Sequence, residues 1–112
     1  MSRHDDERLA DIINAIEAIR QHRVRGDLSD ALVFDAIRMR LLEIGEAVKG
    51  IAPATLNLES QVPWEGVAGM RDRLAHHYFD TSYAVIQVTL DEDLPLLEIA
   101  VRRLVTRNPE PT

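Results

Sequence analysis

Apolar side chains recur at every third or fourth position over much of this chain, and this spacing most narrows the folds open to it. Between residues 4 and 24 one such stripe consists of Leu9, Ile12, Ile13, Ile16 and Ile19. A helix repeats about every 3.6 residues, so these side chains share one face and must be buried against another element. We therefore predict a first helix over residues 4–24.

The second predicted helix covers residues 30–50, with Asp27 or Ser29 as its N-cap. Gly45 lies inside it, although a glycine there costs about 1 kcal/mol relative to alanine. A missing Cβ lets a neighbouring helix come nearer, so we expect close helix–helix approach at Gly45.

Two further helices follow residues 52–62, which lack a clear period and predict a loop with at most one short turn. A third helix should start at Pro63, because proline suits a first helical turn. A fourth should begin near Tyr83.

Pro95 interrupts the last apolar stripe. Within a helix it would remove a hydrogen bond and clash with the preceding turn. We therefore predict a break or sharp kink near residues 91–94 and a fifth helix ending near residue 106. The side chains predicted to be buried there are Leu96, Leu97, Ile99, Ala100, Leu104 and Val105.

These helices with short connections predict an all-α fold, an antiparallel up-down bundle of four to five helices. At 112 residues the chain has the length of one domain. We assign residues 1–107 to that domain and residues 108–112, which include two prolines, to a flexible tail.

Composition and charge narrow the function. The chain has no cysteine, which excludes disulfides and thiolate metal sites. Its net charge of −6 argues against a dedicated duplex-DNA binder but leaves room for a local RNA groove. No apolar run approaches the roughly 20 residues that span a bilayer. We therefore expect a cytoplasmic protein with no membrane contact.

Residues 62–80 hold the chemistry of the chain, because Arg71, His76 and Tyr78 fall within eight positions there. Arginine can grip a phosphate by a two-pronged fork, and histidine can move a proton near pH 7. Together they could cleave RNA through its own 2′-hydroxyl without a metal. A chance pairing of a surface arginine with a half-buried histidine remains the alternative on these residues alone.

The helical wheel separates these groups. Counted from Val67, Arg71 and Tyr78 lie within about 40° of the apolar stripe, whereas His76 points to the opposite side. One regular helix would not bring all three together, and it would bury the charge of Arg71. A homodimer with the motif at or near its interface would solve both problems, so we predict one.

The order Arg71-x4-His76-x-Tyr78 resembles the motif of HepT-like (DUF86) proteins in the HEPN superfamily. Three further stretches agree with that family: Ile44-Gly45-Glu46-Ala47, Pro63-Trp64 followed by Gly69-Met70-Arg71, and Asp93-Leu94-Pro95. The resemblance covers nearly the whole chain in the expected order.

This resemblance implies a HEPN-like helical homodimer that acts as a metal-independent endoribonuclease, the toxin of a type VII toxin–antitoxin pair. It implies Arg71 and His76 as catalytic residues, with no metal or cofactor for cleavage. The implied partner is an MntA-like minimal nucleotidyltransferase antitoxin, which uses its own ATP and Mg²⁺ to attach AMP to Tyr78. Asp72 would support Arg71 or His76, and His77 occupies a variable supporting position.

A different class of function also fits. The chain could be a non-catalytic subunit that presents a substrate or nucleotide to a nucleotidyltransferase. The acidic net charge favours this alternative, whereas the presence of arginine, histidine and tyrosine together favours the nuclease. The sequence does not identify the RNA.

Overall fold

The computed structural model describes residues 3–76 and 83–107, and this part of the chain is helical with no strand. The longer helices are α1 (Arg3–Arg25), α2 (Ala31–Lys49), α4 (Trp64–His76) and α6 (Leu94–Arg107). Shorter elements are α3 (Pro53–Leu56), the 3-10 turn η1 (Asn57–Glu59), α5 (Tyr83–Val88) and the π-helical turn η3 (Thr89–Asp93). The predicted all-α class is confirmed.

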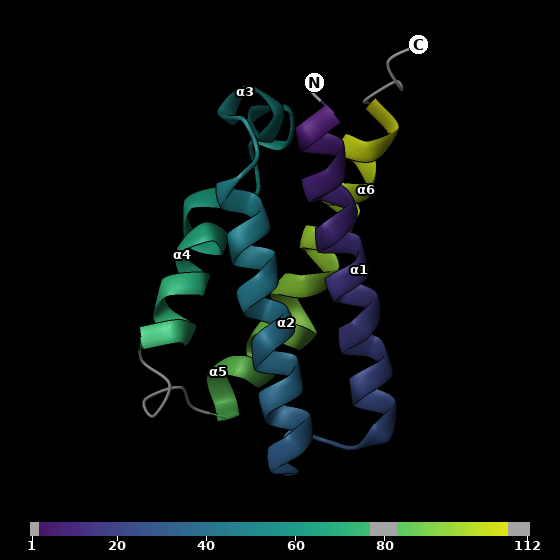
Figure 1. Ribbon diagram of the computed structural model, residues 1–112, viewed down its shortest axis with the longest axis vertical. Helices are drawn as coiled ribbons and strands as arrows, with labels where there is room; N and C mark the ends of the chain where they lie inside the picture. The colour runs from purple at the N-terminus through teal and green to yellow at the C-terminus, as the bar shows by residue number, and fades with distance from the viewer. Residues whose placement is uncertain (1–2, 77–82, 108–112) are drawn as a thin grey trace.

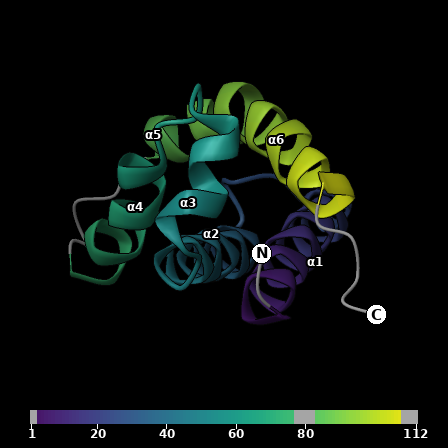
Figure 2. The same ribbon diagram turned by 90° about the horizontal axis from the view of Figure 1, so that it is seen from above.

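Successive long helices run up and down the molecule (Figure 1). α1 and α2 form an antiparallel hairpin, and α4 returns along α2 on the side away from α1. The run from α5 through η3 to α6 then closes the bundle and packs on α1 with its α6 half. Seen from above, α4, α5 and α6 form an arc over the α1–α2 layer (Figure 2).

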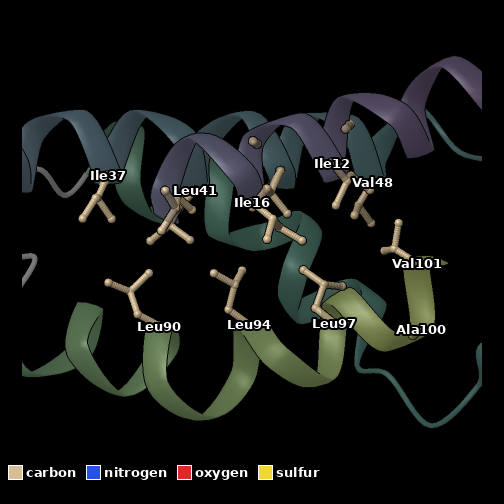
Figure 3. Packing of buried hydrophobic residues seen from close by; sticks show 14 of the residues in the cluster. Ile12, Ile16, Ile37, Leu41, Val48, Leu90, Leu94, Leu97, Ala100 and Val101 are labelled. Carbon is tan, nitrogen blue, oxygen red and sulfur yellow. The ribbon is translucent and has the colours of Figure 1, made fainter. Parts of the chain in front are cut away.

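The apolar stripes meet in one core between these layers. Figure 3 shows Ile12, Ile16 and Leu41 on one side facing Leu94 and Leu97 on the other. Of the predicted α1 stripe, Leu9, Ile12, Ile16 and Ile19 are fully buried and Ile13 is half-buried. The helical period therefore located the inner face of α1 correctly.

The N-cap of α2 is Asp30, so our assignment of this cap to Asp27 or Ser29 was wrong. Oδ1 of Asp30 accepts hydrogen bonds from the backbone N–H groups of Leu32 and Val33, which have no partner inside the helix. Asp27 instead accepts the backbone N–H of Ser29 within the preceding turn.

The chain does not break before Pro95: of the break or sharp kink predicted near residues 91–94, the structure contradicts the break. The five residues of η3 form a π-helical turn, in which the N–H of Leu94 donates to the carbonyl of Thr89. Proline has no N–H, and its ring would clash with a carbonyl one α-turn earlier. A wider turn just ahead of Pro95 removes that clash, so α5 continues into α6.

Three side chains of α6 that we predicted to be buried lie at the surface. Leu96, Ile99 and Val105 are 67%, 49% and 42% exposed, while Leu97, Ala100 and Leu104 are buried as predicted. Only one face of α6 meets the α1–α2 layer. The other apolar positions face outward in the single chain.

Buried carboxylates pin the α3–η1 segment at one end of the bundle. Asp5 of α1 accepts hydrogen bonds from Thr55 Oγ1 at 2.6 Å and from the N–H of Ala52 at 3.1 Å. Burial favours the neutral acid, but these bonds outweigh it and lower the pKa of Asp5. The buried Glu59 pairs with Arg103 and Arg107 of α6. The predicted loop is therefore a tethered pair of short turns.

None of the helices in the described ranges is long and apolar enough to cross a membrane.

Candidate functional site

Gly45 is the point where α4 crosses α2, as the sequence predicted. A Cβ built on Gly45 would lie 2.8 Å from the backbone nitrogen of Arg71, 3.0 Å from its Cβ and 3.0 Å from the carbonyl oxygen of Val67. No other side chain would fit without moving α4. The crossing therefore sets the position of Arg71, the first residue of the motif.

The Arg71 guanidinium lies between two carboxylates. Its Nε is buried and lies 3.1 Å from Oε2 of Glu46 on α2. This contact is an ion pair without the alignment of a hydrogen bond. Its Nη1 donates to Oδ1 of Asp72 at 3.0 Å. The side chain as a whole is 37% exposed, so burial of this charge is compensated by pairing.

Asp72 also faces Lys49, whose Nζ lies 3.5 Å from both carboxylate oxygens. The hydrogen bond from Arg71 and the positive charge of Lys49 lower the pKa of Asp72 below its usual range. Asp72 is thus an anion with two cationic partners. We had expected it to support Arg71 or His76, and the structure brings it to Arg71.

The C-terminal end of α4 is tied to α2 by Arg38, whose Nη1 donates to the carbonyl of Leu74 at 2.8 Å. Carbonyls in the last turn of a helix have no partner inside it, so this bond stabilises the end of α4. Arg40, on the same helix, pairs with Glu43 at 2.8 Å.

His76 is the last residue of α4 and is exposed. Since α4 is regular from Arg71 to His76, the two side chains point about 140° apart around it. No hydrogen bond or ion pair joins them. A single chain therefore holds the two catalytic candidates on different faces of one helix. His77 and Tyr78 lie outside the described residues.

A second surface feature, an apolar groove of about 530 Å³, lies between α4 and the α5–α6 run. Its walls include Val67 and Met70 of α4 and Leu94, Leu96 and Ile99 of the run. Leu41 of α2 and Arg73 of α4 also line this groove. Val67 lies one turn before Arg71, so the groove begins beside the face of α4 that carries Arg71.

Within residues 3–76 and 83–107, no group of three histidine, aspartate or glutamate side chains is placed to hold a metal ion. The charged groups around Arg71 form a mixed cluster, Glu46, Lys49, Arg71 and Asp72.

Sequence reasoning missed Glu46 and Lys49. Glu46 could have been found from Gly45, because the residue next to a glycine at a helix crossing also lies near the contact. Lys49 follows Gly45 by one turn and so shares its face of α2.

The family model described as Ribonuclease HepT-like matches residues 9–104, which include both crossing helices and the whole motif from Arg71 to Tyr78. The chain belongs to this family. The predicted resemblance is thereby confirmed.

Named relatives agree with this assignment. "Probable ribonuclease HepT" of Thermococcus cleftensis is 36% identical over 102 residues, 88% of this chain and 93% of its own. "Putative RNase TTE0752" of Caldanaerobacter subterraneus is 38% identical over 90 residues, 76% of this chain and 80% of its own. No solved structure matched this chain.

The Gly45 crossing can be tested by Gly45→Ala. The added methyl group would press on the backbone of Arg71, so we expect a loss of about 1–3 kcal/mol of unfolding free energy despite the better helix propensity of alanine. Urea denaturation of Gly45→Ala and wild type measures this difference in unfolding free energy.

Gly66→Ala is the matched control on α4. The nearest atom to a Cβ at Gly66, on Pro63, is 4.0 Å away, so this variant should be as stable as wild type or more so. Equal stability of Gly45→Ala and wild type would refute the close crossing.

Proposed function

We propose that this protein is an endoribonuclease that cleaves RNA without a metal, with Arg71 and His76 as its catalytic residues. The observation that carries the proposal is membership of the HepT-like family together with the Gly45 crossing, which anchors Arg71 and leaves its guanidinium partly exposed. Relatives named as ribonucleases support the same class of activity.

In the proposed reaction the RNA 2′-oxygen attacks the adjacent phosphorus and the bond to the 5′-oxygen breaks. The products are a 2′,3′-cyclic phosphate and a 5′-hydroxyl. His76 takes up the proton that the 2′-hydroxyl loses, and its imidazolium returns a proton to the departing 5′-oxygen. Arg71 stabilises the extra negative charge of the phosphorane. No step requires a cofactor.

In this proposal Arg71 of one subunit acts together with His76 of the other subunit of a homodimer. In one chain Arg71 and His76 diverge around α4, and a second copy brings a second motif to the same cleft. Apolar side chains left exposed along the α5–α6 run, namely Val85, Val88, Leu96 and Ile99, supply a surface that such a dimer can bury.

In the cell, we propose, the protein is the toxin of a type VII toxin–antitoxin pair. Its antitoxin is an MntA-like nucleotidyltransferase that uses ATP and Mg²⁺ to attach AMP to Tyr78. Tyr78 follows His76 by two positions, so AMP there adds a phosphate and bulk beside the catalytic residues and excludes RNA. This proposal rests on the sequence resemblance.

A non-catalytic subunit that presents a substrate or nucleotide to a nucleotidyltransferase is the second candidate. The observation in its favour is that Glu46 and Asp72 already neutralise Arg71 in a chain of net charge −6. Such a subunit would bind the transferase tightly and leave RNA intact.

The first prediction from the proposed function concerns RNA cleavage. In EDTA the unmodified wild type should cleave transfer or messenger RNA, and Arg71→Ala or His76→Ala should reduce the rate at least about 100-fold. Arg40→Ala and His4→Ala are matched controls, because both residues lie outside the motif. Intact mass must first show that the wild type carries no AMP. Wild type that leaves both RNA classes intact would favour the binding subunit.

The second prediction concerns the dimer. If Arg71 of one subunit works with His76 of the other, mixing the inactive Arg71→Ala and His76→Ala proteins should restore cleavage through heterodimers. Each variant mixed with itself is the control. A chain that sediments as a monomer at assay concentration would contradict the shared cleft, as would a mixed dimer without activity.

The third prediction concerns Tyr78. With ATP, Mg²⁺ and the nucleotidyltransferase, wild type should gain AMP and lose cleavage, whereas Tyr78→Phe should gain no AMP and stay active. Mass spectrometry and the EDTA assay measure the two effects. AMP found on another residue of Tyr78→Phe would overturn the assignment.

A further inference from the structure

Two carboxylates contact different atoms of Arg71, and this difference separates their roles. Glu46 lies 3.1 Å from Nε, the buried nitrogen at the base of the guanidinium. Asp72 accepts from Nη1, at the outer end, at 3.0 Å. Arginine can bind a phosphate through two parallel N–H groups, using either its Nε side or its Nη end.

The Nε side is closed to substrate, because Nε is buried against α2. The approach that remains is through the Nη end, where Asp72 now sits. Asp72 keeps Lys49 as a second cationic partner at 3.5 Å. When a phosphate binds the Nη end, Asp72 can therefore leave Nη1 and remain paired with Lys49. Glu46 contacts Nε and does not have to move.

We propose that Glu46 is a positioning residue that holds the Arg71 guanidinium through Nε, with its Nη end directed at the RNA phosphate, and that Asp72 is the counter-ion this phosphate displaces. The proposal rests on the proposed nuclease function. It deepens that function by assigning opposite effects to two acidic residues that touch the same arginine.

The test uses Glu46→Gln and Asp72→Asn, two changes that each remove one negative charge beside Arg71. General electrostatics alone would make both variants bind RNA more tightly. Glu43→Gln is the matched control, since Glu43 lies one turn away on α2, pairs with Arg40 and lacks any contact with Arg71.

We expect Glu46→Gln to lower kcat roughly 10- to 100-fold with little change in KM, because the arginine is no longer held in place. Asp72→Asn should lower KM by up to about fivefold, the scale of an exposed ion pair. Glu43→Gln should change neither. A Glu46→Gln protein that turns over like wild type would overturn the positioning role. A KM that rises in Asp72→Asn would overturn the displacement.

An NMR readout does not depend on cleavage. Nε of Arg71 is buried and has no hydrogen bond to a described residue, so its N–H is shielded from water only while the guanidinium stays in place. Its signal, assigned by its loss in Arg71→Lys, should be slow to exchange with water in wild type and faster in Glu46→Gln, where the ion pair that holds the guanidinium is lost. An unchanged exchange rate would overturn the positioning role by itself. If wild type cleaves no RNA, the proposed function fails, while this measurement still decides whether Glu46 holds Arg71.

Discussion

The contact between Gly45 and the backbone of α4 is the constraint on which the candidate site depends. α4 packs mainly on α2, and at the crossing the two backbones are separated by less than the room a methyl group needs. Helices that approach this closely leave little freedom of rotation or sliding. Arg71 thereby inherits its position from α2, and the buried face of its side chain meets Glu46 one residue beyond the glycine. Gly45, which has no side chain, thus determines where the Arg71 guanidinium can lie.

Electrostatics then decides what this arginine can do. In a chain of net charge −6 a lone exposed cation would attract an RNA backbone only weakly, so affinity has to come from a local arrangement. The cluster of Glu46, Lys49, Arg71 and Asp72 is such an arrangement, in which Arg71 pairs with both carboxylates and shares Asp72 with Lys49. In the proposed nuclease an RNA phosphate takes the place of a carboxylate beside Arg71, whereas in the proposed binding subunit the carboxylates keep Arg71 neutralised.

Much of the fold follows from the sequence because it depends on local periodicity. The stripe of α1 and the close approach at Gly45 were both predictable from spacing and side-chain size, whereas the two short turns α3 and η1 were not. Pro95 misled us, because proline signals a broken α-helix and nothing local indicates that a π-helical turn will accommodate it. The outward positions of Leu96 and Ile99 depend on how α6 is rotated against α1, which is a tertiary property. The Glu46 contact was hidden for the same reason, since it joins residues 25 positions apart.

The π-helical turn η3 also makes the closing helix sensitive to chain length. In a loop, one residue more or fewer alters the path of the backbone and little else. Within an α-helix, one added residue rotates everything beyond it by about 100°. A residue added between Thr89 and Asp93 would turn α5 relative to α6, so Ile86 and Leu97 could no longer both face the core. Removing one residue would close η3 to an α-turn and bring a carbonyl against the ring of Pro95. The length of this segment is therefore as constrained as the identity of any buried side chain, although most of its residues lie at the surface.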